Sequence, residues 1–269
     1  MNNLHRELAP ISDAAWAAID DEACRTLKRH LAARRVVDVV GPKGVDFSAV
    51  GTGHIRPIDP PSEGVEAHLR ETLGLAELRV PFELSRSAID DIERGAEDSD
   101  WDPLKEAARR IAFAEDRAIF DGYAPARIQG VRPGASNPAV PLPAHAKGYP
   151  NTVAKALSEL RLAGVEGPYK LLLGTEPFTA IDGGSDDGYP VREHVEKLID
   201  GEVIWAPAIA GGLVLTTRGG DFKMSIGQDL SIGYLGHDDA VVRLYLQESF
   251  TFQFLTAEAA VALAPAGGA

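Results

Sequence analysis

Residue types that support catalysis are present in this sequence, but none stands in a recognised catalytic pattern. The chain lacks a G-x-S-x-G nucleophile elbow, an H-E-x-x-H zinc motif, a P-loop and a complete G-x-G-x-x-G fingerprint. Gly51 and Gly53 match only the first two glycines of that fingerprint. The 7 histidines are spread along the chain, and none lies close in sequence to another at metal-ligand spacing. The sequence therefore predicts that this protein is not an enzyme.

The other candidates for chemistry are a single cysteine and two groups of acidic residues. Cys24 lies between apolar positions of a predicted helix, where a buried, inert thiol is expected. The acidic run from Glu97 to Asp102 lacks a calcium-loop pattern and suits the start of a helix, whose dipole favours negative charge. Glu115 and Asp116 are neighbours in a predicted helix, so their side chains diverge, and acid–base catalysis would need partners from elsewhere. We predict no metal site.

Composition excludes several classes of protein. The 269 residues include 40 acidic and 27 basic side chains, so the formal net charge is −13. Nucleic-acid binding needs clustered Lys and Arg, and the acidic balance argues against it. The one cysteine rules out an internal disulfide framework and suits a reducing compartment. No stretch approaches the roughly 20 apolar residues of a membrane span, and Met1 to Pro10 lacks a signal-peptide layout. We expect a cytoplasmic protein with no membrane partner.

The first part of the chain pairs a helix with a long stretch that has no core of its own. An amphipathic helix is predicted to follow Ser12 or Asp13 as its N-cap and to fill most of the first 35 residues. Residues 36–40 form a short β-like run. Residues 41–75 are rich in Gly, Pro, Thr and Ser and predict an extended, two-stranded arm. Because such a stretch is unusual inside a compact domain, we expect it to pack against a partner, which another chain would supply.

The rest of the chain mixes helices and strands without regular βαβ alternation, which predicts the α+β class. Helices are predicted from Asp102-Pro103 to Gly122, from Asn151 to Gly164 and from Pro190 to Gly201. Strands are predicted over residues 78–84, 169–173, 203–209, 213–217 and 241–255.

Motifs spread over nearly the whole chain carry a family resemblance. They include Leu8-Ala9-Pro10 with Trp16, the segment from Leu78 to Gly95, Glu115-Asp116 to Ile119-Phe120, and Gly167-Pro168-Tyr169. The most specific is Arg218-Gly219-Gly220-Asp221-Phe222-Lys223, followed by Gly227 to Tyr234 and by Arg243 to Phe252. Together these segments closely resemble the encapsulins, shell-forming proteins once grouped with the linocin-type bacteriocins.

The resemblance implies the tailed-phage major capsid fold of the Hong Kong 97 type, which is an α+β fold. Such a fold has a peripheral domain with a spine helix, an axial domain and an extended loop. Mapped onto this chain, the peripheral domain comprises residues 1–50, 79–130 and 220–269, with the spine helix over 103–121. The extended loop comprises residues 51–78, and the axial domain residues 131–219.

The resemblance also implies a function. The resemblance implies that the chain self-assembles into a hollow icosahedral nanocompartment of about sixty copies, and closed symmetry of this kind fits a non-catalytic chain. Encapsulins hold a cargo enzyme through the cargo's C-terminal targeting peptide. The cargo implied is a dye-decolorizing-type peroxidase or a ferritin-like iron protein, which gives a role in oxidative-stress defence or iron storage. Any haem or iron would belong to the cargo, and no cofactor is expected in the shell chain.

Two sites follow from the resemblance. The first is the loop that would line the fivefold pore: Asp182, Gly183, Gly184, Ser185, Asp186, Asp187, Gly188 and Tyr189. Five copies would gather its acids around a small opening and bias the passage of ions toward cations. Its glycines permit mobility. An ordinary solvated surface loop is the alternative interpretation.

The second site is the groove for the cargo peptide. The residues that match it are Leu27, Leu31, Arg34, Asp38, Leu230 and Ile232. The apolar members would bury small apolar side chains of the peptide, and Arg34 and Asp38 would fix it by charge-assisted hydrogen bonds. Leu27 stands where some relatives have an aromatic residue. Plain core packing is the alternative for the four apolar positions. Arg34→Glu is expected to abolish loading without preventing assembly.

Two other functions share features with this interpretation. A phage-derived major capsid protein would have the same fold and would package nucleic acid. A bacteriocin or protease-like enzyme is the other alternative, because some relatives were once labelled so, although no nucleophile motif supports it. The sequence leaves open which cargo is held, the size class of the shell, the state of the pore and whether a small molecule binds the shell.

Overall fold

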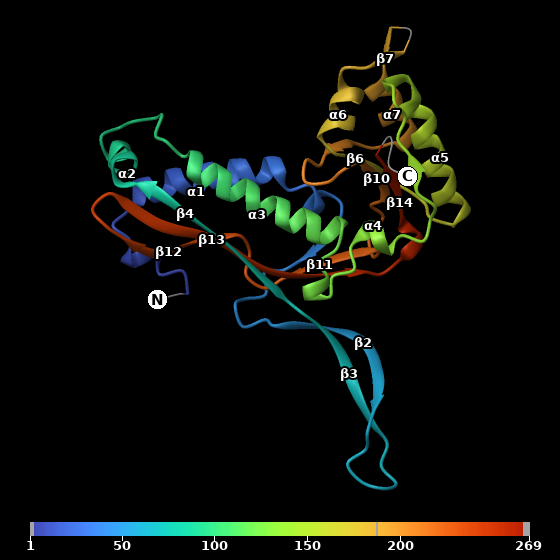
Figure 1. Ribbon diagram of the computed structural model, residues 1–269, viewed down its shortest axis with the longest axis horizontal. Helices are drawn as coiled ribbons and strands as arrows, with labels where there is room; N and C mark the ends of the chain where they lie inside the picture. The colour runs from blue at the N-terminus through green and yellow to red at the C-terminus, as the bar shows by residue number, and fades with distance from the viewer. Residues whose placement is uncertain (1–2, 187, 266–269) are drawn as a thin grey trace.

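The computed structural model describes residues 3–186 and 188–265. Figure 1 shows an elongated body in two parts and a long hairpin that projects away from it. One part holds α1, α3 and a sheet that contains β13, and the other holds a second sheet with α5, α6 and α7. Mixed helices and sheets of this kind confirm the predicted α+β class.

The first sheet has the order β1-β11-β13-β12, and β4 also pairs with β13. Its strands are Asp38–Val40 (β1), Ala76–Ser85 (β4), Phe222–Ile226 (β11), Ser231–His237 (β12) and Val241–Phe254 (β13). The first part of β13 pairs with β4 and β12, and its last residues pair with β11. β1 runs parallel to β11, so the segment that follows the first helix reaches the edge of this sheet.

Two long helices pack on this sheet. α1 (Asp13–His30) begins where Ser12 Oγ accepts the N–H of Ala15 at 3.2 Å, which confirms Ser12 as its cap. α3 (Asp102–Phe120) has Pro103 in its first turn, where a missing N–H costs nothing. Apolar residues that recur at helical spacing on both helices bury a shared core with the sheet, among them Ile19, Leu104, Ile111, Leu84 and Leu244.

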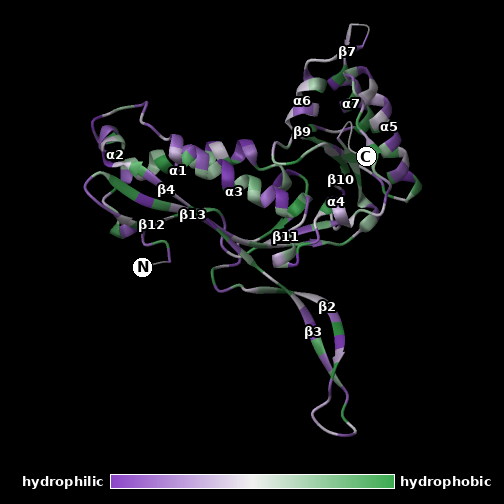
Figure 2. Ribbon diagram, viewed as in Figure 1, coloured by the Kyte–Doolittle hydropathy of each residue, from purple (hydrophilic) through white to green (hydrophobic). Residues whose placement is uncertain are grey.

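The second sheet has the order β5-β14-β10-β6-β9. Its strands are Val140–Pro141 (β5), Tyr169–Leu173 (β6), Val203–Trp205 (β9), Gly212–Thr216 (β10) and Ala260–Ala264 (β14). Beside it lie α5 (Tyr149–Leu162), α6 (Thr175–Asp182) and α7 (Val191–Ile199). The strands read as continuous apolar runs because both faces are covered, and Figure 2 shows the hydrophobic colour concentrated there.

The projecting hairpin is formed by β2 (Ala49–Ile58) and β3 (Ala67–Gly74), which pair antiparallel with each other. Among the described residues, neither strand joins another sheet. The two-stranded arm predicted within residues 41–75 is therefore confirmed. A second, small hairpin of β7 (Ser185–Asp186) and β8 (Tyr189–Pro190) lies at the far tip of the part with the second sheet (Figure 1).

Several predicted helix limits differ from the structure. α3 begins at Asp102 rather than after it. α5 begins at Tyr149 rather than after Asn151, because Tyr149 and Pro150 are buried and Pro is tolerated in the first turn of a helix. Two helices were not predicted: α2 (Arg86–Glu93), which Ser85 caps, and α6, whose eight residues are too few for clear periodicity. The described chain also has a short helix, α4 (Val131–Gly134), and 3₁₀ turns at Arg6–Leu8 (η1), Ala33–Arg35 (η2), Ala124–Ala126 (η3), Ala146–Gly148 (η4) and Ala257–Ala259 (η5).

Two segments lie in other parts of the fold than the proposed domain limits implied. Residues 76–78, predicted in the extended loop, are the first residues of β4 and pair with β13. Residues 260–264, predicted in the peripheral domain, form β14 between β5 and β10 of the second sheet. Val261 and Leu263 of β14 are fully buried in the core of that sheet, which explains why the chain end crosses to it.

Candidate functional site

The four apolar residues predicted to bind a peptide lie together beside α1. Leu27 on α1 and Ile232 on β12 are buried in the core between the helices and the first sheet, at 8% and 3% exposed. Leu31, which ends α1, and Leu230, which precedes β12, are half-buried and pack against the edge of the same core. Leu31 and Leu230 therefore offer accessible apolar surface, and Leu27 and Ile232 form the layer beneath them.

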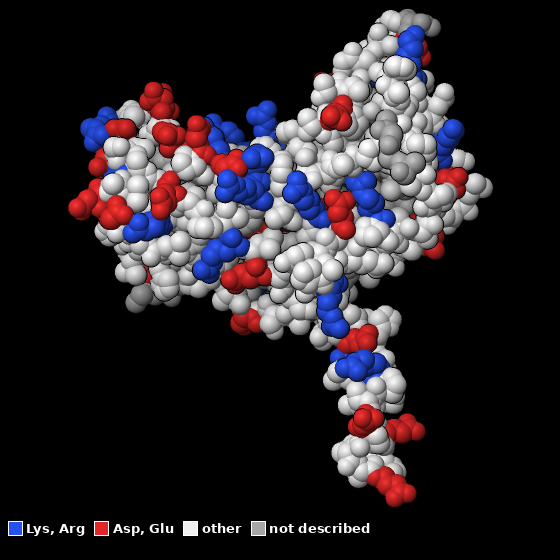
Figure 3. All heavy atoms as spheres, in the orientation of Figure 1, with Lys and Arg blue, Asp and Glu red and all other residues white. Residues whose placement is uncertain are grey.

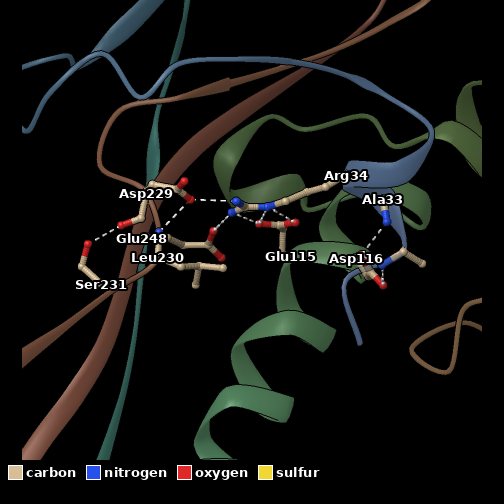
Figure 4. Close-up of polar contacts among 9 residues, drawn as sticks. Ala33, Arg34, Glu115, Asp116, Asp229, Leu230, Ser231 and Glu248 are labelled. Carbon is tan, nitrogen blue, oxygen red and sulfur yellow. Dashed lines mark hydrogen bonds and ion pairs between the residues drawn. The ribbon is translucent and has the colours of Figure 1, made fainter. Parts of the chain in front are cut away.

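Arg34 lies in η2 and contacts three carboxyl groups, as Figure 4 shows. Its Nε donates to both oxygens of Glu115 at 3.0 and 2.9 Å, and its Nη2 donates to Glu115 Oε2 at 2.6 Å. Nη2 also donates to Glu248 Oε2 at 3.0 Å, and Nη1 donates to Asp229 Oδ1 at 2.7 Å. The guanidinium thus joins η2, α3, β13 and the loop before β12.

The charges in this cluster are buried unequally. The side chains of Glu115 and Glu248 are fully buried, and that of Asp229 is 45% exposed. Burial raises the pKa of Glu248 well above its ordinary value, and the nearby Glu115 raises it further. Burial by itself lowers the pKa of Arg34. The hydrogen bonds from Arg34 to Glu115 and Asp229, together with the negative charges of Glu115 and Glu248, raise the pKa by more than burial lowers it. The guanidinium therefore stays protonated. The surroundings of Glu248 therefore favour its protonated form, which limits the excess of negative charge in the cluster.

Asp229 links this cluster to Leu230. Its Oδ1, which accepts from Arg34, also accepts the backbone N–H of Leu230 at 2.8 Å. The hydroxyl of Ser231 donates to the Asp229 carbonyl at 2.6 Å. Arg34 therefore holds the loop that presents Leu230, and its guanidinium atoms Nε, Nη1 and Nη2 all bind groups of its own chain.

Asp116 fixes the backbone that carries Arg34. Its carboxyl oxygens accept the N–H groups of Ala32, at 3.0 and 3.2 Å, and of Ala33, at 2.9 Å. Burial raises the pKa of Asp116 to about 7, although these backbone hydrogen bonds oppose the shift. The side chains of Glu115 and Asp116 do diverge, as predicted, but both bind the segment 32–34. Sequence reasoning missed this role, because the only signal was two adjacent acids amid the apolar residues of a helix, and their partner lies about eighty residues away.

Asp38 lies apart from the apolar group. Its Oδ2 accepts the N–H of Gly220 at 2.6 Å and so ties the start of β1 to the loop before β11. It lines a polar pocket of about 160 Å³ together with Arg34, Thr216 and Asp221. The predicted peptide-binding residues therefore form two groups, an apolar edge at Leu31 and Leu230 and a polar pocket at Asp38, and Arg34 contributes to both.

The predicted pore loop forms the tip that joins α6 to α7. Asp182 pairs with Arg192 at 2.6 Å, and Asp186 pairs with Lys147 at 3.1 Å. Asp187 lies outside the described residues. The side chain of Tyr189 is exposed and accepts a hydrogen bond from Lys197. Because cations accompany both described acids of this loop, its negative charge is smaller than the sequence suggested.

The glycines of this loop have different surroundings. Gly188 has a φ of +88°, in the left-handed region that favours glycine, and has open space around it. A Cβ added at Gly184 would stand 2.5 Å from the Cβ of Ala146 and 2.8 Å from the carbonyl of Ala180. A Cβ at Gly183 would meet only the Thr179 carbonyl, at 3.5 Å, and Ser185 is exposed. Gly184 thus permits close packing at the base of the loop, and Gly188 permits its turn.

The arm exposes apolar side chains along most of its length. Ile55 and Ile58 on β2, Val65 at the tip and Leu69 on β3 are all at least 41% exposed. Single exposed apolar residues are ordinary, but four on one narrow hairpin predict a surface that another molecule covers.

The described residues include neither a cluster of metal ligands nor a helix that could span a membrane. Within residues 3–186 and 188–265, no group of three or more His, Cys, Asp or Glu side chains is placed to hold a metal ion. The helices in this part of the chain include none with the length and apolar character needed to cross a membrane. Cys24 is exposed on α1, not buried as its apolar neighbours had predicted.

The sequence matches the Linocin_M18 family, described as "Encapsulating protein for peroxidase", over residues 1–251. Among curated proteins, it is 61% identical to a type 1 encapsulin shell protein of Rhodococcus erythropolis, over 98% of this chain and 100% of that one. It is 57% identical to a type 1 encapsulin shell protein of Mycobacterium tuberculosis, over 98% and 99% of the two chains. A third such protein, of Rhodospirillum rubrum, is 46% identical over 98% and 96%.

Solved structures confirm the fold. A virus-like particle protein from Pyrococcus furiosus superposes with a TM-score of 0.66 at 14% identity, over 92% of this chain and 98% of that one. A protein of Mycobacterium phage Cain superposes with a TM-score of 0.55 at 16% identity, over 89% and 91%. The fold is that of tailed-phage major capsid proteins, as predicted.

Proposed function

The chain belongs to the Linocin_M18 family of encapsulating proteins, which groups it with the type 1 encapsulin shell proteins, and from this we propose that it assembles into a closed, hollow icosahedral shell of about sixty copies. The observation that carries the proposal is the β2–β3 arm. It leaves the body, joins no other sheet among the described residues and exposes Ile55, Ile58 and Leu69. A neighbouring copy would cover these side chains.

A docking site for cargo is supported by the apolar edge beside α1. Leu31 and Leu230 would bury small apolar side chains of an extended C-terminal peptide, and Leu27 and Ile232 would support them from beneath. Arg34 would act mainly by holding the Leu230 loop in place, and Asp38 would bind polar groups of the peptide at the adjoining pocket.

The cargo proposed is a peroxidase of the dye-decolorizing type or a ferritin-like iron protein. The family description, which names a peroxidase, supports the first. The shell would then serve oxidative-stress defence or iron storage in the cytoplasm, with haem or iron carried by the cargo. The chain itself would be structural rather than catalytic, which agrees with the names of its relatives. The loop from Asp182 to Tyr189 would line the pore.

Electron microscopy of the purified protein tests assembly. We expect uniform hollow particles from the wild type and none from Ile55→Asp with Ile58→Asp, because a carboxylate at a covered apolar contact is costly to bury. Leu162→Asp, on α5 at 81% exposure, is the matched control and should assemble normally. Dispersed monomers of the wild type would contradict the proposal.

Cargo docking is tested by co-expression with a peroxidase that carries an apolar C-terminal tail. Leu31→Asp and Leu230→Asp should each reduce the peroxidase that co-purifies with particles by tenfold or more, since each loses roughly the 1.5–3 kcal/mol of a buried leucine. Leu235→Asp, on the same strand as Ile232 but 52% exposed, should leave loading unchanged. Equal loading in all three variants would refute the site.

A phage-derived capsid that packages nucleic acid has the same fold, and phage proteins are among the structural neighbours at 9–16% identity. The relatives at 46–61% identity are shell proteins, which favours the compartment. Particles with the absorbance ratio of nucleic acid after nuclease treatment would support the capsid instead.

A further inference from the structure

A groove of about 590 Å³ lies between α1 and α3. Arg25 and Arg29 of α1 line it opposite Lys105 and Arg109 of α3, and we call it the α1–α3 groove. Leu27, in the layer beneath the proposed cargo site, lies roughly 200° around α1 from Arg29, given 3.6 residues per turn. The groove is therefore on another face of α1 than the apolar edge and is a separate surface.

Positive charge exceeds negative charge in this groove, although the chain as a whole carries −13. Four cationic side chains line it against three carboxyl groups, those of Glu22, Asp102 and Glu106. Glu106 alone accompanies two cations, with Arg109 Nη2 at 2.7 Å and Arg110 Nε at 2.9 Å. Arg29 has no hydrogen-bond or ion-pair partner within the described part of the chain. Figure 3 shows basic side chains over the region of α3 and the end of α1, with acidic ones between them.

In the described chain, ion pairs and ring contacts hold several of the side chains that line the groove, but not Arg29. Arg25 pairs with Glu22 at 2.6 Å, and Lys105 pairs with Asp102 at 3.1 Å. At one end, His30 shares a hydrogen bond of 2.8 Å between its Nδ1 and the Thr26 carbonyl. Its ring packs against Phe113 and Trp205, with centroids 5.9 and 5.7 Å away. A ligand would thus meet the paired cations Arg25, Lys105 and Arg109 and the guanidinium of Arg29, which is unpaired among the described residues.

We propose that the α1–α3 groove binds an acidic segment of a partner polypeptide, independently of the apolar docking site. The groove has the volume that ligand sites commonly have. Its cations outnumber its carboxyl groups by one and so suit carboxylates, and its own carboxyl groups decide which anion fits. A nucleic acid carries a dense row of phosphates that Glu22, Asp102 and Glu106 would repel. Carboxylates spaced along a peptide can meet the cations and avoid the acids.

The probe is a fluorescent reporter protein that ends in alternating Glu and Gly, with no apolar tail, co-expressed with the full-length chain. We expect the reporter to co-purify with particles at low salt and to be lost at high salt, because the contacts are exposed and screened. Arg29→Gln with Arg109→Gln should lower the reporter per particle by about fivefold to tenfold, the effect of removing two ionic contacts. A reporter with Gln in place of Glu should not be retained.

The matched control removes the same charge elsewhere. Lys155→Gln with Arg161→Gln, both exposed on α5, should retain the reporter as the wild type does. Equal loss in both double variants, or equal retention of the Gln reporter, would overturn the proposal. The proposal would also be overturned if wild-type particles bound no acidic reporter. The groove would then be covered by a second copy of the chain. If the double variant does not assemble, Arg29→Gln alone gives the test. Apolar-tailed peroxidase, loaded in parallel, reports the cargo site separately.

Discussion

Asp229 Oδ1 lies 2.7 Å from Arg34 Nη1 and accepts the backbone N–H of Leu230 at 2.8 Å. One carboxyl oxygen therefore connects the buried Arg34 cluster to the loop that presents Leu230. This relationship changes what the arginine is expected to do. In the free chain its hydrogen bonds stabilise the chain's own loop, and any effect on cargo passes through the position of that loop.

The first prediction concerns Asp229. Asp229→Ala should reduce the retention of an apolar-tailed peroxidase several-fold, because Leu230 loses the acceptor that fixes its loop, while the free energy of unfolding falls by only about 1–2 kcal/mol. Asp229→Asn, whose Oδ1 still accepts, should recover most of the loading. Retention per particle and thermal melting measure the two effects.

Asp238 provides the matched control for Asp229. Its Oδ1 accepts the N–H groups of Ala240 and Val241 in the turn that joins β12 to β13, so Asp238→Ala removes a similar loop contact far from Leu230. It should leave loading intact. If both alanine variants lower loading by the same amount, the cause is a general loss of stability. The proposal that Asp229 supports loading by fixing the Leu230 loop is then wrong.

The second prediction concerns Arg34. Arg34→Glu was expected to abolish loading without preventing assembly, but the structure places the new carboxyl group among Glu115, Glu248 and Asp229. Removing the cation that pairs with buried carboxyl groups costs about 3–5 kcal/mol, so we expect little folded protein. Arg34→Met combined with Glu115→Gln should regain much of this stability, as measured by soluble yield and chemical unfolding. A stable, assembled Arg34→Glu particle would show that the cluster matters little.

The third prediction is a pH dependence from Asp116. Burial raises its pKa in the folded chain to about 7, above the roughly 3.9 of an unfolded Asp. Between these values the folded chain binds more protons than the unfolded chain, so stability falls as pH rises from about 4 to 7. Asp116→Asn should flatten that fall, because the amide cannot ionise and its oxygen can still accept from Ala33. Melting temperatures across this range measure the difference in slope.

Asp102→Asn is the control for this titration, since Asp102 is 82% exposed at the start of the same helix. Its melting curves should follow the wild type at every pH. Parallel slopes for the wild type and Asp116→Asn would mean that Asp116 does not carry the dependence.

The fourth prediction concerns the proposed pore. Arg192→Gln removes the cation that pairs with Asp182, so cations should enter particles faster, by a fewfold at low ionic strength and less at high salt. The rate at which Co²⁺ quenches an encapsulated fluorescent protein measures entry. Lys155→Gln changes the charge equally on α5 and should have no effect. Unchanged entry in Arg192→Gln would place the loop away from the ion path.

Local patterns were enough to predict many elements of the fold. The helix capped by Ser12, the apolar run Tyr169–Leu173 and the alternation along Val241–Phe254 each depend on neighbouring residues, and the structure contains all three. The Gly- and Pro-rich composition likewise predicted an arm without its own core. The motifs that resemble the encapsulins, such as Arg218 to Lys223, identified the family and hence the capsid fold.

Tertiary structure decided how distant segments combine. Arg34 meets Glu115, Asp229 and Glu248 only because η2, α3 and β13 pack together, and no periodicity relates residues 81 to 214 positions apart. β14 joins the second sheet, between β5 and β10, because Val261 and Leu263 are buried in the core of that sheet. Sequence alone determined the local elements and the family, because short-range patterns encode them. The partners of buried charges emerged only from the packing of the whole chain.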